Sequence, residues 1–519
     1  MSAPASVRNL PGAGEALSAL GYRGMLAVVA LATAAAAVAG EPVLAMVPVL
    51  LAAAAYAMTR VPLRHSAAVL LVFLLAIEDS AETLGQWRTP LALVGDLFHQ
   101  RLDEAAQIPG LAVTGMEVAL ALLFGVWAYR RAQGSTMDVD GQVPFARVIR
   151  PFLVLYLVGV LFSEVVGLAR GLPLAPWKLR NLLHPLVLGL FFLAAHRGPR
   201  DYPLLGRVVV FAACVRAVLA IVVQRIAIAE TGGKFATATN HGDSVLFAVA
   251  AFLLLVAAVE RPDRRRLFWA ALLLPLLLLG MRENGRRIVW VMLAFAPVLA
   301  YLVSPMRAWK RALTRVLLVM VPLVGLYVGV GWNRGSPLFS PVQTLRGLVD
   351  TTSNRSSYWR EVEIWNIATS MRESPLLGIG LGGEYTENMA NDDISAFYKE
   401  YRQWPHNTVL GLLMLMGLFG FTAIWVLPSL VVFLAVRSYR MASSPELRAA
   451  ALGCLGAVTA CGVLAYGDTG AHYTQYKVFF GMALAVSARL AVATGAWPSR
   501  THLTAGAGAG GWSRGEPST

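Results

Sequence analysis

Two kinds of side chain in this sequence could do chemistry at a fixed place: arginines in short polar segments, and a histidine at the start of an apolar run. Arg282, Arg286 and Arg287 lie in MRENGRR, Arg355 begins RSSYWRE, and His406 begins HNTVL. A guanidinium group meets phosphate oxygens with a planar fork of donors and stays charged at any relevant pH. An imidazole titrates near neutrality and can take a proton from a hydroxyl group. These residue types are suited to anion binding and proton transfer.

The composition indicates what must position these residues. The chain has 519 residues, of which 57% are hydrophobic and only 14% are charged, and its mean hydropathy is +0.60. A soluble domain carries roughly 25% charged residues, so a soluble enzyme, a disulfide-rich secreted domain and a disordered chain are excluded. The apolar residues form long blocks and not the short alternating segments of an outer-membrane barrel. We therefore predict an all-α polytopic integral membrane protein.

Apolar runs along the whole chain predict about 12–14 membrane spans, with fourteen as the best count. The net charge of +14 is dispersed between these runs, which favours membrane topology over nucleic-acid binding as its cause. The runs lie at 24–40, 43–58, 66–78, 110–129, 151–169, 181–196, 208–228, 244–259, 267–281, 288–304, 314–331, 406–436, 449–466 and 477–496.

Alternate connections between the runs are dense in arginine and lysine, as at 261–266 and 307–315. Since cytoplasmic loops carry the excess of basic residues, these connections are predicted to face the cytoplasm, together with both termini. The connections 281–287 and 332–405 then face outward. Three arginines in 281–287 are unusual on that side, and either tolerance or function explains them.

This topology divides the chain into five parts. They are a cytoplasmic N-terminus at 1–23, a transmembrane bundle of about eleven spans at 24–331, a large periplasmic loop at 332–405, about three further spans at 406–496, and a disordered cytoplasmic tail at 497–519. The first apolar run has no cleavage site and is interpreted as a signal anchor. The three cysteines form no C-x-x-C pair or His/Cys cluster, so no metal site is predicted.

The outer loop 332–405 contains a predicted helix from Arg355 to about Arg372. Its spacing places Arg355, Tyr358, Trp359, Val362 and Trp365 on one face, which suits a helix lying on the membrane surface. Pro375 ends this helix and begins the glycine-rich turn PLLGIGLGG. The loop then closes at His406, at the mouth of the next span.

Three motifs in this order resemble the O-antigen ligase and polymerase superfamily, which comprises the bacterial Wzy-type polymerases and WaaL-type ligases. The motifs are R-x-x-x-W from Arg355 to Trp359, P-L-L-G-x-G from Pro375 to Gly380, and H-N-x-x-L from His406 and Asn407 through Leu410, followed by Gly417 and Gly420. The family also carries an outward arginine in S-R-x-x-W. Here RRIVW offers Arg287 three residues before Trp290, with Arg286 in place of the serine. The resemblance covers about 280–425.

The resemblance implies a GT-C-like fold and a glycosyltransferase. It would move a glycan from an undecaprenyl-diphosphate carrier to an acceptor hydroxyl at the periplasmic face of the bacterial inner membrane. It also implies inverting, metal-independent transfer without a cofactor. Arg287, with Arg282 or Arg286, and Arg355 would hold the diphosphate, while His406 would take the proton. Further candidates for substrate binding are Trp359, Arg360, Asn407 and Arg216; Arg360 also suits lipid headgroups, and Asn407 also suits a helix cap.

Two enzyme activities fit these motifs. A polymerase joins one carrier-linked repeat to another and would use the extra arginines for a second diphosphate, whereas a ligase passes the glycan to a different acceptor such as lipid A-core. We favour the polymerase. The expected partners are the carrier-linked glycan, a polysaccharide or lipid A-core acceptor, membrane lipids, and a flippase or chain-length regulator, with no nucleic acid.

An anionic-solute transporter or flippase is the alternative from a different class, because Arg216 lies in the middle of a span. A buried partner such as Glu164 or Glu117 would make Arg216 structural instead. Several other polar residues fall toward the outer ends of their spans and suggest either a polar cavity or ordinary hydration of span ends. They are Glu117, Glu164, His184, His241, Asp243, Asp468 and His472.

Overall fold

The computed structural model describes residues 42–77, 90–105, 112–234, 238–306, 308–339, 355–395 and 400–498, with short pieces at 27, 30–31, 33–34, 342–343 and 346. The side chains of 42–45, 47, 90–93, 105, 308–309, 337 and 355–357 are outside this description. The predicted span 24–40 and the tail 497–519 lie almost entirely outside it. The described residues are helical, apart from loops and one isolated bridge between Arg101 and Thr114.

Up to residue 284 the described ranges contain ten helices. They are α2 (Pro42–Arg60), α3 (Leu63–Ala76), α4 (Pro90–His99), α5 (Leu102–Ala105), α6 (Gly115–Ala132), α7 (Ile149–Ala169), α8 (Pro176–Ala195), α9 (Tyr202–Thr231), α10 (Gly242–Glu260) and α11 (Arg264–Asn284). After residue 284 they contain α12 (Ile288–Val303), α13 (Ala308–Gly331), η1 (Pro337–Phe339), α15 (Arg355–Met371), α16 (Thr408–Met441), α17 (Pro445–Gly467), η3 (Gly470–His472) and α18 (Thr474–Ala493).

This helix order confirms the polytopic all-α prediction. Among the described residues, nine helices are long and apolar enough to cross a membrane, namely α7, α8, α9, α10, α11, α13, α16, α17 and α18. The helices α3 and α12 are apolar but shorter, and α2 and α6 coincide with two further predicted spans. Thirteen of the fourteen predicted runs therefore coincide with a helix.

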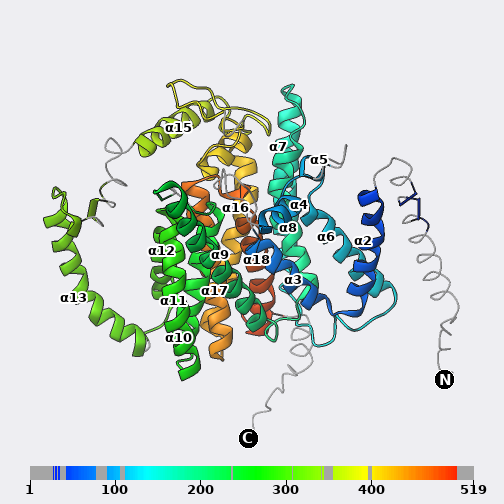
Figure 1. Ribbon diagram of the computed structural model, residues 1–519, viewed down its shortest axis with the longest axis horizontal. Coiled ribbons are helices and arrows are strands. Elements are labelled where there is room, and N and C mark those ends of the chain that lie inside the picture. The colour runs from blue at the N-terminus through cyan, green and yellow to red at the C-terminus, as the bar shows by residue number, and fades with distance from the viewer. Residues whose placement is uncertain are drawn as a thin grey trace, which may run out of the picture.

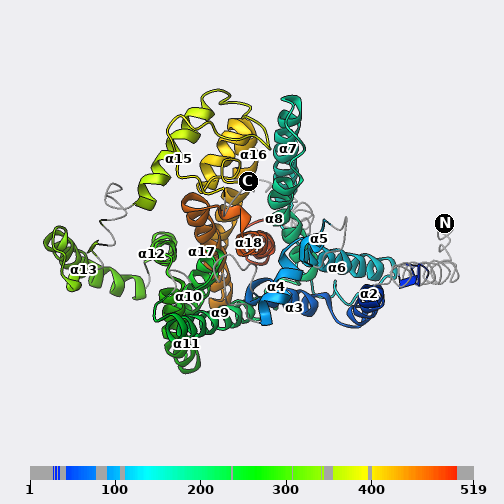
Figure 2. The ribbon, with the colours of Figure 1, turned by 45° about the horizontal axis from the view of Figure 1, so that its top comes forward.

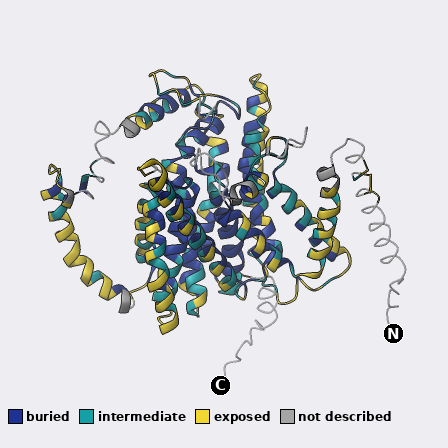
Figure 3. Cartoon of the chain, in the orientation of Figure 1, coloured by how far each residue is buried: buried dark blue, intermediate teal, exposed yellow. Residues whose placement is uncertain are grey.

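The centre of the molecule is a bundle in which α16 packs along α7 and α17, α10 packs along α17, and α18 packs along α8. These helices contain most of the buried positions, and 89% of the apolar window of α18 is inside the protein (Figure 3). By contrast, α13 stands apart from the bundle in both ribbon views (Figures 1 and 2), and none of its apolar window is buried. In a bilayer such a helix satisfies its backbone internally and presents its side chains to lipid.

The two ends of the bundle carry different connections. One end joins α10 to α11 and α16 to α17, and there Glu260 accepts hydrogen bonds from Arg448, at 2.6 Å, and Tyr439, at 2.9 Å. Arginine is frequent in these connections. The opposite end, at the top of Figure 1, carries α15, the start of α16 and the end of α17. We call it the α15 end.

The helix α15 occupies the positions where the sequence predicts a helix, and the face that it turns to the protein is not the predicted amphipathic face. Of that predicted face Val362 is buried, whereas Tyr358 and Trp365 are exposed. The buried face also includes Glu363 and Asn366. These polar groups can be buried because they have hydrogen-bond partners across the loop: the Asn366 side chain pairs with both the N–H and the carbonyl of Met389, at 2.9 and 2.8 Å. The face therefore docks α15 on protein.

The helix α16 is interrupted at Gly417, whose φ of +62° and ψ of −176° are not helical. Glycine populates this region readily because it has no Cβ. The segment 375–381, which carries the P-L-L-G-x-G motif, lies against the interruption and continues to α7, where the N–H of Leu381 donates to the carbonyl of Ser163 at 3.1 Å. The interruption is not apparent in the predicted span 406–436.

Candidate active site

His406 forms a carboxylate–imidazole pair with Glu363 at the α15 end. Asn407 caps α16, since its side-chain oxygen accepts a hydrogen bond from the N–H of Leu410 at 3.0 Å. This cap places His406 just before the first turn. Its Nδ1 lies 3.2 Å from Oε1 of Glu363, and its backbone N–H faces both carboxylate oxygens at 3.3 Å.

The environment of this pair favours a charged imidazole. The Glu363 side chain is only 4% exposed, whereas the His406 side chain is 33% exposed. Burial opposes the charge, but the hydrogen bond and the charge of Glu363, helped by the Asp468 carboxylate, raise the pKa of His406 above its ordinary value. Within the described ranges, Nε2 of His406 has no hydrogen-bond partner. A pair of this kind holds the ring and stabilises the imidazolium that forms when Nε2 takes a proton.

A second pair, His241 with Asp468, lies beside the first. Nδ1 of His241, before α10, contacts the carboxylate of Asp468, which follows α17. The His241 ring stacks on Tyr473 with centroids 5.8 Å apart. The carbonyl of Asp468 accepts hydrogen bonds from the N–H and the hydroxyl of Thr408, at 3.3 and 3.0 Å, which joins this pair to the start of α16.

The acidities of the neighbouring groups indicate which one can act as a base. Burial opposes the charge of Asp468, but His241, Arg360 and His406 lower the pKa of its carboxyl to about 2. Burial lowers the pKa of His472, in η3, to about 4. A base works best when its pKa lies near the working pH, so His406 is the best general base of the three.

The arginines predicted to bind phosphate lie at the same end. Arg282 and Arg287 flank the turn between α11 and α12, and both side chains are exposed, while Arg286 is half-buried. This turn adjoins the site, because the side chain of Ile288 packs against Gly467, the residue before Asp468.

On α15, Arg360 is exposed and acts electrostatically on both His406 and Asp468. Trp359, one residue earlier, is half-buried. Arg355 is the first residue of α15, but its side chain lies outside the described residues. The structure thus brings His406, Asn407 and Arg360 together at one site and leaves the contacts of Arg355 undescribed.

Arg216 is buried inside the bundle, and its partner Asp243 lies in the first turn of α10, two residues after His241. The Arg216 side chain is 2% exposed, and its guanidinium is paired with Asp243 of α10, with Nε 3.0 Å from the carboxylate. Asp243 also accepts a hydrogen bond from Gln475 of α18 at 3.3 Å. A buried charge needs such a partner. Asp243 supplies it in place of the two glutamates named above, which favours a structural role for Arg216. We leave it out of the proposed site.

The two glutamates have other roles. Glu117 accepts from Arg180 at 2.8 Å and contacts Nε2 of His184 at 2.9 Å. Oε1 of Glu164 accepts from the N–H of Ala175 at 2.8 Å. These polar residues therefore form small groups, which fix α6, α7 and α8 to one another or to their connections.

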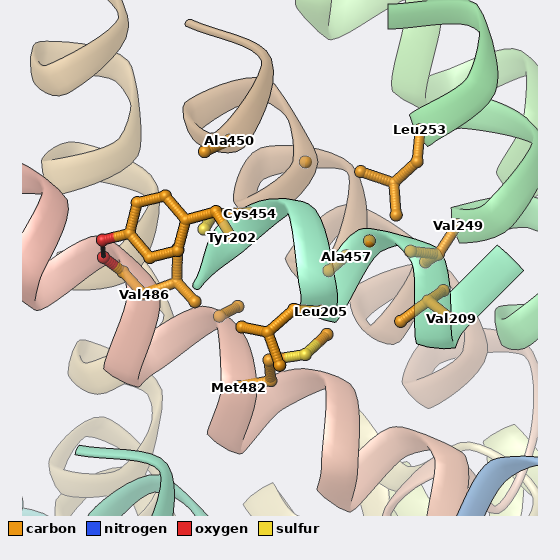
Figure 4. Close-up of a pocket in the computed structure, with 13 residues that line it drawn as sticks. Tyr202, Leu205, Val209, Val249, Leu253, Ala450, Cys454, Ala457, Met482 and Val486 are labelled. Carbon is orange, nitrogen blue, oxygen red and sulfur yellow. Dashed lines mark hydrogen bonds between the residues drawn. The ribbon is translucent and has the colours of Figure 1, made fainter. Parts of the chain in front are cut away.

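An apolar pocket lies elsewhere among the described helices, between α9, α10, α17 and α18 (Figure 4). Its walls are apolar except for the Cys454 thiol and the Tyr202 hydroxyl, which donates to the carbonyl of Val486 at 3.3 Å. Such a lining offers nothing to bind a phosphate or to activate a hydroxyl, so we assign no chemistry to it.

Glu363 is the residue that sequence analysis missed. It is one of two glutamates in REVEIW, and only the fold shows that it faces His406, 43 positions later. A signal was present in principle, because Glu363 falls on the same side of the helix as Trp359 and Asn366, but that side is not the one with the largest aromatic residues.

Comparison with known protein families decides the identity of this region. Residues 283–425 match the O-antigen ligase family. The chain therefore carries a domain of the O-antigen ligase and polymerase superfamily. The matched region spans a little over a quarter of the chain and contains Arg286 and Arg287, all of α15, and His406, so it confirms the resemblance predicted from the motifs. No curated protein matches the chain.

Proposed function

We propose that this protein is a glycosyltransferase of the bacterial inner membrane that moves a glycan from an undecaprenyl-diphosphate carrier to an acceptor hydroxyl. The observation that carries the proposal is the His406–Glu363 pair within the O-antigen ligase domain, beside arginines at the same end of the bundle. The arginine-rich connections at the other end favour a cytoplasmic location there, with the α15 end in the periplasm.

In the proposed step, the acceptor oxygen attacks the anomeric carbon from the face opposite the carrier, which inverts the configuration. A new carbon–oxygen bond forms while the bond from that carbon to the carrier phosphate breaks, and its electron pair leaves with the diphosphate. The acceptor proton passes to Nε2 of His406, and Glu363 stabilises the resulting imidazolium. Arg287, Arg355 and Arg360 offset the charge that develops on the diphosphate.

Two buried donors support a polar substrate at this site. Nδ2 of Asn407 and Nε1 of Trp359 are buried and have no hydrogen-bond partner among the described residues. An unpaired buried donor costs free energy, so such groups are expected where a ligand supplies the acceptor. Sugar hydroxyls and phosphate oxygens both do so.

A labelled carrier-linked repeat tests the proposal and separates the two enzyme activities. With purified protein and no other acceptor, we expect a ladder of products, because a polymerase uses the repeat as both donor and acceptor. Transfer only after lipid A-core is added would identify a ligase. Absence of transfer under both conditions would contradict a glycosyltransferase.

The pH dependence of glycan transfer should show the effect of Glu363 on the titration of His406. His406 must be neutral to accept a proton, and Glu363 raises its pKa, so the rate should fall on the acid side at a higher pH than an ordinary histidine would impose. Glu363→Gln should move that acid limb to lower pH and reduce the maximal rate, since the imidazole becomes a weaker base. Glu373→Gln, at an exposed position after the same helix, is the control. An acid limb that stays in place in Glu363→Gln would remove Glu363 from the mechanism.

A further inference from the structure

The interruption of α16 is completed by another part of the chain. In an unbroken helix the N–H groups of residues 418 and 419 would donate to the carbonyls of 414 and 415. Here the N–H groups of Leu418 and Phe419 donate to the carbonyls of Pro375 and Leu376, at 2.9 and 3.1 Å. The carbonyls of Met414 and Leu415 accept from the N–H groups of Ile379 and Gly380, at 3.0 and 2.8 Å. Four hydrogen bonds to the segment 375–381 thus replace the two that the break removes.

The close approach of these backbones requires glycine at two facing positions. A methyl group on Gly417 would overlap the nitrogen of Gly378 and the carbonyl of Leu376. A methyl group on Gly378 would overlap the carbonyl of Leu415. Both glycines also have positive φ, +62° and +76°, which other residues adopt only with strain. Neither position can gain a side chain without moving the segment.

The segment connects the two halves of the His406–Glu363 pair. The short helical stretch before Gly417 begins at the Asn407 cap, next to His406. The segment follows α15, which carries Glu363, after three residues. The last of these, Ser374, accepts a hydrogen bond at 2.8 Å from Arg170, the residue after α7. Both halves of the pair therefore lie on pieces of chain that are held together at 375–381.

We propose that the backbone of 375–381, docked in the break of α16, is a positioning element that sets the spacing between Glu363 and His406. Its importance for catalysis rests on the proposed function, whereas its effect on the pair does not. Movement of the segment would displace the end of α15 relative to the start of α16, and the Glu363 carboxylate would move away from the imidazole. The P-L-L-G-x-G motif then acts through its backbone and not through a side chain.

The titration of His406 measures this spacing without substrate. The charged groups that face the imidazole are Glu363 and Arg360 from α15 and Asp468 after α17. Protein labelled with ¹³C,¹⁵N-histidine can be titrated by NMR in lipid nanodiscs, with His406→Gln to assign the signal. Gly417→Ala should lower the pKa of His406 to the value found in Glu363→Gln. In the double variant of Gly417→Ala and Glu363→Gln, the two decreases in the pKa of His406 should not add, because both substitutions remove the same interaction.

Two further variants keep the test decisive. Gly329→Ala in α13, where a methyl group meets open space, should leave the titration unchanged. If Gly417→Ala does not accumulate, Ser374→Ala can replace it in the test. This substitution removes only the hydrogen bond from Arg170 and should lower the pKa of His406 by a smaller amount. An unchanged His406 pKa in folded Gly417→Ala, or a shift that persists in the Glu363→Gln background, would overturn the proposal. The expected shifts together with absent glycan transfer would instead reject the proposed function alone.

Discussion

Replacing His406 with alanine is expected to lower the rate of glycan transfer by about 10²–10⁴, the usual worth of a positioned general base. Glu363 accepts the Nδ1 contact, so the imidazole presents Nε2 to the acceptor, whereas the pKa values of Asp468 and His472 are lowered to about 2 and about 4. Binding of the donor should change little, because the arginines and not the imidazole would hold the diphosphate. Steady-state kinetics with purified protein and labelled carrier-linked repeat should therefore show a loss in kcat with a nearly constant KM.

The matched control for this variant is His65→Ala. His65 is an exposed histidine in the first turn of α3, and α3 begins beside the loop residue Asp138, which accepts a hydrogen bond from the N–H of Leu63 at 2.8 Å. It should retain full activity. If purified His406→Ala keeps near-normal turnover, His406 is only part of the entry to α16, and another group must activate the acceptor.

Replacing Arg287 with alanine should reduce transfer by about 10²–10³, the cost typical of removing one group that stabilises developing negative charge. Arg287 is exposed at the start of α12, next to the residue that packs against Gly467, so its guanidinium can reach an anion near Asp468 and His406. The motif predicts the same loss for Arg355→Ala. Lysine at either position should restore only part of the rate, because an ammonium group cannot form the two-pronged contact.

Arg207→Ala provides the control for general positive charge. Arg207 is an exposed arginine in the first turns of α9, at the end of the bundle opposite α15. Its loss should leave the kinetics unchanged. Full activity of lysine at both Arg287 and Arg355 would show that charge alone matters and that bidentate geometry does not.

The membrane-spanning architecture could be predicted from the sequence because apolar length alone decides it. Runs such as 244–259 and 449–466 coincide with α10 and α17 to within a few residues. The break in α16 could not be predicted. Gly417 lies inside an uninterrupted apolar stretch, and only the approach of a segment some forty residues earlier makes a non-helical conformation stable there.

The candidate site shows the same division between local and tertiary information. His406 and the arginines could be found because their types and motifs are local. The partner of His406 could not, because pairing with Glu363 depends on how α15 docks, and the larger aromatic residues pointed to a different face. Arg216 is an example inside the bundle. The sequence places it in the middle of a span, which predicts a buried acidic partner, but only the packing of α9 against α10 identifies that partner as Asp243.

The docking of 375–381 in the break of α16 also bears on how the protein is made. The ribosome synthesises this segment, and α7 before it, ahead of α16. When α16 enters the bilayer, the four backbone groups exposed by its break can at once find partners that are already present. Within lipid each such group left unpaired would cost several kcal/mol, so we expect α16 to insert stably only once the segment 375–381 is in place. The order of elements along the chain is thus also an order of assembly.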